Sequence, residues 1–244
     1  MTYCVAIKVD EGIVFASDSR TNAGVDYVRT YSKMHLFNWP QDRTIVILTS
    51  GNLATSQAVI NSIQHDLENP QSGINLQTAK HLFEIAHYVG SLCQKEQAEH
   101  SKAFKDSRKA LESSFIIGGQ IGDQDDDIYL VYPEGNYITV SPETPYMQIG
   151  ETKYGKPILD RIVTSTTNLN DAARCALVSL DSTMRSNISV GPPLEMAIYK
   201  ADSLTEPQYM KIELDTPLYQ NIQKHWSEGL QAAFRNLPKF DWEK

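Results

Sequence analysis

Strand-forming and helix-forming segments are grouped along this chain rather than alternating. Patterns of apolar residues predict four strands, two helices, three strands, two helices, two strands and a final helix, in that order. Such grouping favours an α+β fold with antiparallel sheets, because a doubly wound parallel sheet needs a helix after almost every strand. No linker or low-complexity tract divides the sequence, so we expect a single domain over residues 1–244.

The expected strands are short runs rich in β-branched and aromatic residues, and the expected helices carry apolar residues three or four positions apart. The strands lie at residues 2–9, 13–19, 31–37, 44–48, 114–121, 128–132, 137–140, 195–200 and 208–214. The helices lie at residues 54–67, 76–110, 153–163, 170–185 and 219–236. We expect the last helix and the tail after it, about residues 218–244, to serve in packing or assembly.

Composition excludes several classes of function. Apolar residues make up 41% of the chain and charged residues 21%, as in an ordinary soluble globular protein. The net charge of −8 argues against a nucleic-acid partner, and no apolar run approaches the roughly 20 residues that span a bilayer. Three widely spaced cysteines and the absence of a signal-peptide pattern favour a reducing, cytoplasmic location. No metal-ligand or cofactor motif is found, so we expect neither a metal nor a cofactor.

The first two strands predict a hairpin that brings a carboxylate towards the start of the chain. A three-residue connection at residues 10–12 would place Val9 opposite Ile13. Thr2 would then lie diagonal to Asp18 on one face of the sheet, within reach of its side chain. A shift of one residue would break this arrangement, because it moves every side chain to the other face. The same register puts an apolar layer on the opposite face, formed by Tyr3, Val5, Ile7, Val9, Ile13 and Phe15.

Thr2 is a candidate nucleophile because it directly follows Met1. Removal of Met1 would leave a threonine with its hydroxyl and a free α-amine on one residue. A threonine hydroxyl alone is a poor nucleophile, and an adjacent amine can take its proton. An α-amine has a pKa of about 7.7–8.0, so a modest downward shift makes it an effective base near neutral pH. Threonine is small enough for methionine aminopeptidase to act, which favours removal of Met1.

Lys33 and Gly51 each have both a structural and a functional interpretation. Lys33 lies within an expected strand, where it either points to solvent or forms a buried cation beside Thr2, paired with Asp18. A buried cation there would keep the α-amine neutral, because like charges disfavour each other's ionised forms. Gly51 lies between a strand and a helix, where it is either a turn glycine or a backbone N–H donor to an oxyanion.

The first part of the chain resembles a proteasome β subunit. That family begins with Thr, followed by D-G-V-V-x-A-x-D-x-R, then Lys, then a small-residue S-G. The matching segments here are Thr2, residues 10–20 (DEGIVFASDSR), Lys33 and residues 49–52 (TSGN). The resemblance implies that Thr2 is the nucleophile, that Asp18 and Lys33 support it, and that Gly51 donates to the oxyanion. It also implies that Thr21, Asn22 and Leu53 line the substrate cleft.

The second part of the chain follows the family in order, with two departures. Residues 115–119, 129–135 and 148–150 resemble the family's later segments. Where the family has Gly-Ser-Gly, this chain has Glu151 in place of the serine. Asp181 matches the aspartate of the family's Asp-x-x-Ser, which implies that it belongs to the catalytic residues. Its partner serine would be Ser182 or Ser186, and this choice stays open. These departures, residues 190–193 (VGPP) and the long last helix resemble Anbu, a bacterial proteasome-related group without a propeptide.

The resemblance implies a four-layer αββα sandwich of the N-terminal-nucleophile hydrolase type. It further implies a threonine peptidase or amidohydrolase that acts on peptide or protein substrates within a homo-oligomer. The oligomer could be a ring, an open ring or a helical assembly. Two alternatives stay open: a self-assembling scaffold with little or no peptidase activity, and an amidase of the same fold that acts on small molecules.

Overall fold

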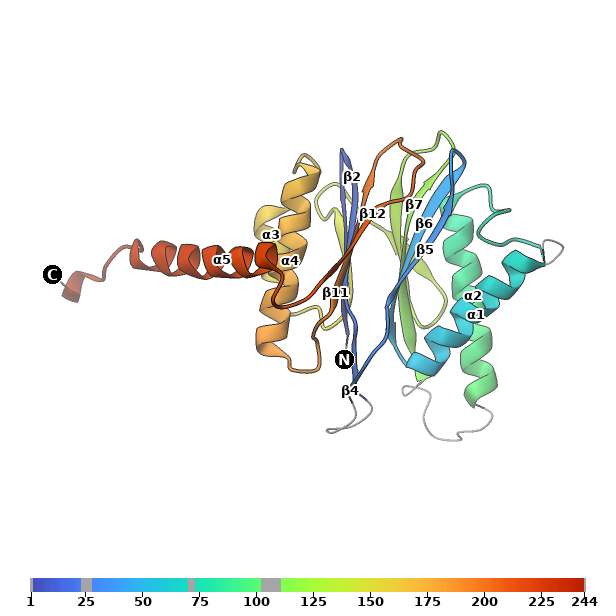
Figure 1. Ribbon diagram of the computed structural model, residues 1–244, viewed down its shortest axis with the longest axis horizontal. Coiled ribbons are helices and arrows are strands. Elements are labelled where there is room, and N and C mark those ends of the chain that lie inside the picture. The colour runs from blue at the N-terminus through green and yellow to red at the C-terminus, as the bar shows by residue number, and fades with distance from the viewer. Residues whose placement is uncertain (1, 23–27, 70–72, 102–110, 244) are drawn as a thin grey trace.

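The chain folds into four layers in the order helix, sheet, sheet, helix, as Figure 1 shows. The computed structural model describes residues 2–22, 28–69, 73–101 and 111–243. Both five-stranded sheets are antiparallel throughout. The predicted αββα sandwich is therefore confirmed.

The first sheet carries the start of the chain in one of its inner strands. Strand β1 lies between β10 and β2, and β11 and β12 complete the sheet. The strands, in spatial order, are β10 (Tyr146–Gly150), β1 (Tyr3–Val9), β2 (Gly12–Asp18), β11 (Leu194–Lys200) and β12 (Gln208–Ile212). Because β1 is paired on both sides, the residue that precedes it is held at the end of the sheet.

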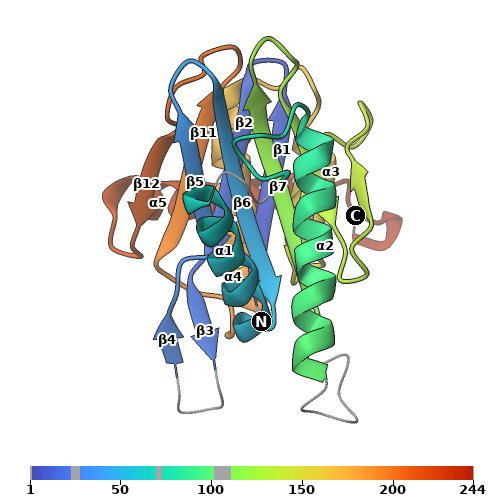
Figure 2. The same cartoon turned by 90° about the vertical axis from the view of Figure 1, so that its right-hand side faces the viewer.

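The second sheet is formed by strands from the middle of the chain. In spatial order they are β5 (Met34–Trp39), β6 (Arg43–Gly51), β7 (Ser113–Ile121), β8 (Asp127–Val131) and β9 (Tyr137–Thr139). A separate ribbon of two short strands, β3 (Arg20–Asn22) and β4 (Val28–Thr30), extends from the same end of the molecule at which the chain begins (Figure 2).

Two helices cover each outer face, and a fifth projects from the body. Helices α1 (Leu53–Glu68) and α2 (Leu82–Ser101) pack on the second sheet, and α3 (Lys156–Ile162) and α4 (Leu169–Ser186) pack on the first. Helix α5 (Pro217–Arg235) begins against α4 and extends away, followed by a short 3-10 turn at Asp241–Glu243 (Figure 1). Within the described residues, no helix has both the length and the apolar composition needed to cross a bilayer.

Three layers of buried apolar side chains hold the sandwich together. The middle layer lies between the sheets and includes Ile13 and Phe15 of β2 and Ile116 of β7. One outer layer joins the first sheet to α3 and α4, and the other joins the second sheet to α1 and α2. Both faces of each sheet are therefore buried, which is the main source of stability for such a fold.

The predicted register of the first hairpin was wrong by one residue. Val9 pairs with Gly12, not with Ile13, because the connection has two residues instead of three. The shift sends Ile13 and Phe15 into the middle layer, while Tyr3 faces the helices. The alternation of apolar residues could not reveal the error, because β2 is buried on both faces.

Several element boundaries also differ from the prediction. Strand β10 was not expected, and Lys33 precedes β5 instead of lying within a strand. The second helix begins at Leu82 and not at residue 76, because the Glu84 carboxylate accepts hydrogen bonds from the backbone N–H groups of Lys80 and His81. Residues 102–110, the predicted end of that helix, lie outside the described residues.

We expect Gly118→Ala to lower the free energy of unfolding by about 1–3 kcal/mol, because it overpacks the middle layer. A Cβ atom at Gly118 would lie 2.7 Å from Phe15 of the facing sheet and 2.7 Å from Ile128. Gly229→Ala on α5 is the control, since nothing lies within 4 Å of the added atom. It should leave the free energy unchanged or raise it by up to about 1 kcal/mol. Urea unfolding at one protein concentration measures both. A Gly118→Ala variant that is no less stable than the wild type would show that the two sheets can adjust.

Candidate active site

The carboxylate of Asp18 is the centre of the candidate active site. Asp18 ends β2 and is completely buried. Its Oδ1 accepts hydrogen bonds from the backbone N–H of Tyr3 at 3.0 Å and from the Lys33 ammonium at 2.6 Å. Its Oδ2 accepts a third from the backbone N–H of Gly191 at 3.1 Å. Burial raises the pKa of this carboxyl, while the Lys33 ammonium and the two N–H groups oppose the shift.

Lys33 is a buried cation and does not point to solvent. Its side chain is 7% exposed, and its ammonium also donates to the backbone carbonyl of Arg20 at 2.7 Å. The predicted pairing of Lys33 with Asp18 therefore exists in the structure. The ammonium lies at the same cavity as Thr2, the residue that precedes β1.

Thr2 is held through its backbone at the end of the first sheet. Its carbonyl accepts a hydrogen bond from the backbone N–H of Glu151 at 2.7 Å. The neighbouring Gly150 allows this close approach, since a Cβ atom there would lie 1.9 Å from the Thr2 carbonyl oxygen. The residue that follows Thr2 is bound by Asp18, so Thr2 is fixed from both sides of the strand.

A cavity of about 530 Å³ brings most of the predicted site residues together. It contains the candidate nucleophile, the buried cation and the candidate oxyanion donor. The lining residues are Thr2, Arg20, Thr21, Lys33, Thr49, Ser50, Gly51, Leu53, Ser56 and Gly150. Two of the three predicted substrate-contacting residues, Thr21 and Leu53, are among them. Asn22 lies in β3, and its side chain is outside the described residues.

Gly51 occupies a position that requires glycine. Its φ angle is +107°, and a Cβ atom there would lie 2.3 Å from the backbone carbonyl of Glu112. The next residue, Asn52, caps α1 by accepting a hydrogen bond from the Thr55 N–H at 3.0 Å. The turn between β6 and α1 is thus tightly specified, and it presents its backbone to the same cavity as Thr2.

Asp181 lies apart from this group of residues. It is buried on α4, and its carboxylate accepts hydrogen bonds from Gln223 and, at 2.8 Å, from Arg185. The Tyr219 hydroxyl, on α5, lies 3.5 Å from the same carboxylate. The structure therefore directs Asp181 towards α5. The two candidate partner serines, Ser182 and Ser186, do not line the Thr2 cavity.

Tyr3 is a residue that the sequence analysis missed. Its hydroxyl lies 2.5 Å from Ser179 Oγ on α4 and accepts a hydrogen bond from Gln148 Nε2 at 2.6 Å. Burial raises the pKa of this hydroxyl, so it stays protonated. Through these contacts Tyr3 ties the start of β1 to the helix layer. A tyrosine within an apolar strand was the available signal, because a buried hydroxyl needs a partner.

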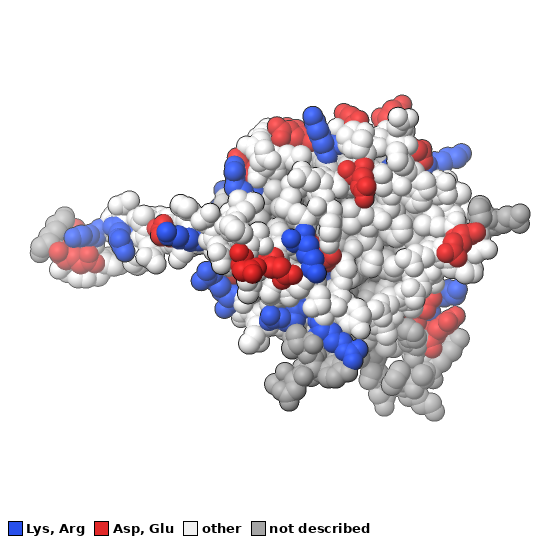
Figure 3. Space-filling model, in the orientation of Figure 1, with Lys and Arg blue, Asp and Glu red and all other residues white. Residues whose placement is uncertain are grey.

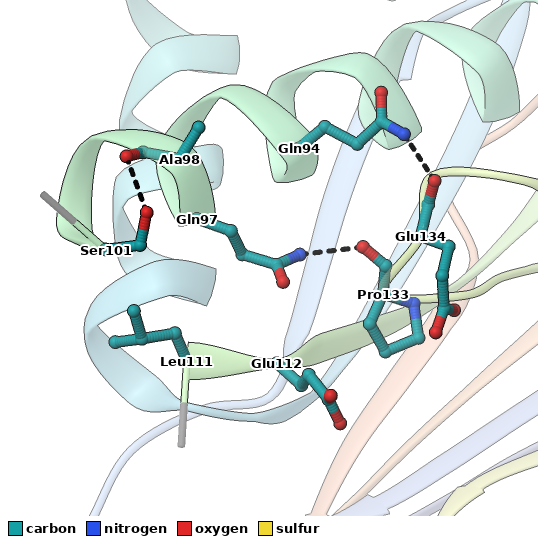
Figure 4. A pocket seen from close by; sticks show the side chains of 8 residues that line it. All are labelled: Gln94, Gln97, Ala98, Ser101, Leu111, Glu112, Pro133 and Glu134. Carbon is teal, nitrogen blue, oxygen red and sulfur yellow. Dashed lines mark hydrogen bonds between the residues drawn. The ribbon is translucent and has the colours of Figure 1, made fainter. Parts of the chain in front are cut away.

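A second cavity, of about 450 Å³, lies beside α2 and the turn that follows β8 (Figure 4). Gln97 donates to the carbonyl of Pro133 at 2.8 Å, and Gln94 donates to the carbonyl of Glu134. None of the predicted site residues lines it. Among the residues that the structure describes, no group of three His, Cys, Asp or Glu side chains could hold a metal ion.

Comparison with known proteins extends these observations. The sequence profile of the proteasome subunit family matches residues 2–199. Anbu (ancestral beta-subunit) from Yersinia bercovieri is 41% identical, with a TM-score of 0.92 over 98% of this chain and 99% of that chain. The helical assembly of the Anbu complex from Pseudomonas aeruginosa is 43% identical, with a TM-score of 0.92 over 98% of both chains. An Anbu (Gly-1) mutant from Hyphomicrobium sp. strain MC1 is 39% identical, with a TM-score of 0.91 over 99% and 100%. No curated protein matches.

We expect Lys33→Met to lower the free energy of unfolding by about 3–5 kcal/mol, because it leaves the buried Asp18 carboxylate without its counterion. Lys8→Met is the matched control. It breaks a 3.5 Å pair with Asp127 whose side chains are 29% and 24% exposed. Its cost should be only about 0–1 kcal/mol. Denaturant unfolding of both variants checks this, and similar losses would mean that the Asp18 pair is solvated in solution.

Proposed function

The chain belongs to the proteasome subunit family and to its Anbu group, and we propose that it is an N-terminal-threonine hydrolase that cleaves peptide bonds. One observation carries the proposal. Thr2 shares a cavity with Gly51 and with Lys33, whose ammonium is paired with the completely buried Asp18. The same arrangement would serve any amide substrate that fits the cavity.

In the proposed mechanism, removal of Met1 frees the α-amine of Thr2. The amine takes the hydroxyl proton while Oγ attacks the carbonyl carbon of the scissile amide. The Gly51 backbone N–H donates to the resulting oxyanion. The C–N bond then breaks, the amine returns the proton to the leaving nitrogen, and an ester with Thr2 remains. Water, deprotonated by the same amine, hydrolyses this ester and regenerates the hydroxyl.

Lys33 and Asp18 would support this chemistry through their charges. A cation near Thr2 lowers the pKa of the hydroxyl and of the α-amine, which favours a neutral amine that can act as a base. Asp18 holds the Lys33 ammonium in place by accepting its hydrogen bond at 2.6 Å. For Asp181 we propose a supporting role only. Its partners lie on α4 and α5, so its effect on Thr2 would pass through the helix layer.

A scaffold with little or no peptidase activity is the second candidate. Two observations favour it: Glu151 replaces the family's supporting serine, and the Asp181 carboxylate is engaged by α5 instead of by the Thr2 cavity. An amidase for small molecules differs from the peptidase in its substrate alone. Reactivity of Thr2 separates the scaffold from the two enzymes, and turnover of peptides separates the enzymes from each other.

We further propose that the chain assembles with copies of itself through α5 and the tail. The described part of α5 buries little besides Tyr219. Large apolar side chains exposed along α5 and the tail are Leu218, Leu230, Phe234, Leu237, Phe240 and Trp242. Along the projecting arm, charged side chains of both signs are separated by uncharged surface (Figure 3). A second copy is the favoured occupant, since the related Pseudomonas aeruginosa Anbu forms a helical assembly.

The enzymatic proposal predicts covalent labelling of Thr2 by a peptide epoxyketone, because this reagent needs both the hydroxyl and the free α-amine of a terminal threonine. Intact-mass measurement should show a chain without Met1 and one adduct. Thr2→Ser should retain the adduct and Thr2→Ala should lose it, while all three residues allow removal of Met1. A wild-type chain that keeps Met1, or that lacks Met1 and forms no adduct, would favour the scaffold.

The assembly proposal predicts that Phe234→Glu raises the dissociation constant of the oligomer at least about tenfold, because a charge enters an apolar contact. Phe234 is 75% exposed in the isolated chain. Ala232→Glu adds the same charge two positions away, on nearly the opposite side of the helix, and should leave assembly unchanged. Mass photometry over a dilution series measures both. If both variants have the dissociation constant of the wild type, α5 is not part of the interface.

A further inference from the structure

Glu195 is a buried carboxylate for which the proposed mechanism has no use. It lies on β11, where it pairs with Ser17 of β2, and it is 5% exposed. Its neighbours along the strand, Leu194, Met196 and Ala197, are buried and apolar. Burial of a carboxylate is costly unless its oxygens accept good hydrogen bonds. Within the described residues it forms no ion pair with Lys or Arg, so the hydrogen bonds that its oxygens accept have to stabilise it.

Three donors meet at this carboxylate. The Tyr209 hydroxyl donates to Oε1 at 2.7 Å, and the Ser32 hydroxyl donates to Oε1 at 2.9 Å. The backbone N–H of Lys33 donates to Oε2 at 3.3 Å. Two of these three contacts hold the chain immediately before β5, where regular strand pairing has not yet begun. For the Lys33 N–H, Glu195 thus supplies the hydrogen bond that a neighbouring strand would otherwise provide.

The backbone of Lys33 is bound on both sides as a result. Its N–H is bound by Glu195, and its carbonyl accepts a hydrogen bond from the Thr49 N–H at 2.9 Å. Thr49 lies on β6, two residues before Gly51. From this fixed backbone the Lys33 side chain extends to Asp18. Lysine has a long flexible side chain, so the place of its ammonium depends on how firmly the backbone is held.

We propose that Glu195 is a positioning residue that fixes the backbone of Lys33 and so holds the Lys33 ammonium against Asp18. This inference rests on the proposed function for its effect on Thr2, but the placement of Lys33 can be tested separately. A carboxylate suits the task because it is an acceptor only and has two oxygens, whereas a glutamine would direct an N–H₂ group at one of the three donors. Misplacement of a catalytic group by about 1 Å can reduce a rate about 100-fold.

The test compares Glu195→Gln with the matched variant Tyr209→Phe in the full assembled chain. Tyr209→Phe removes a donor to the same carboxylate but leaves the contact with Lys33 intact. One measurement is the rate constant for labelling of Thr2 by a peptide epoxyketone. The other is acetylation of each lysine by an acetyl N-hydroxysuccinimide ester, read by peptide mass spectrometry. Lys95 and Lys153 are exposed and serve as internal standards.

For Glu195→Gln we expect labelling of Thr2 to slow at least about tenfold, while Lys33 is acetylated faster and the two standards are unchanged. Tyr209→Phe should stay within about twofold of the wild type in both measurements. If Glu195→Gln does not fold, Glu195→Asp replaces it, because it keeps the carboxylate but its shorter side chain draws the oxygen away from the Lys33 N–H. Protection of Lys33 at the wild-type level would overturn the inference. Faster acetylation without slower labelling would overturn its link to Thr2. A wild type that is not labelled would contradict the proposed function, and acetylation of Lys33 would then decide the inference alone.

Discussion

The buried pair of Asp18 and Lys33 is the interaction on which this end of the molecule depends. One carboxylate, completely buried, accepts hydrogen bonds from the Tyr3 N–H, the Gly191 N–H and the Lys33 ammonium. It therefore joins the start of β1, the loop before β11 and the segment before β5. These segments come from both sheets of the sandwich. A buried charge is tolerated only when it is fully paired, so each segment has to be in place for the others to be stable.

Most residues of this arrangement could be predicted from the sequence, but the contacts that hold them together could not. Grouped strands and helices predicted the class of fold, and short motifs identified Thr2, Lys33 and Gly51, which the structure gathers around one cavity. The predicted hairpin register was wrong, because a strand buried on both faces carries no alternation to fix its pairing. Asp18 nevertheless reaches the start of β1, through a backbone N–H instead of a diagonal side-chain contact.

The residues that sequence reasoning missed are those whose partners are distant in the chain. Tyr3 contacts Ser179, and Glu195 contacts Ser32, so neither interaction follows from local spacing. Asp181 lies in a motif that is evident in the sequence. In the structure, however, its carboxylate accepts a hydrogen bond from Gln223 of α5, which the motif does not predict. A side chain shared between a body helix and the projecting helix ties the position of α5 to that of α4, and α4 also binds Tyr3.

The way in which Thr2 is held explains how the proposed nucleophile can be ordered. Once Met1 is removed, as the proposed function requires, Thr2 would lack the chain on one side, and such residues are often mobile. Here the Thr2 carbonyl is bound by the Glu151 N–H, and the next N–H along the chain is bound by Asp18. The residue after β10 supplies the first contact and the buried ion pair supplies the second. Neither contact uses the hydroxyl or the nitrogen of Thr2, so both would stay available for the proposed reaction. The entropy of positioning them would then be lost on folding and not during that reaction.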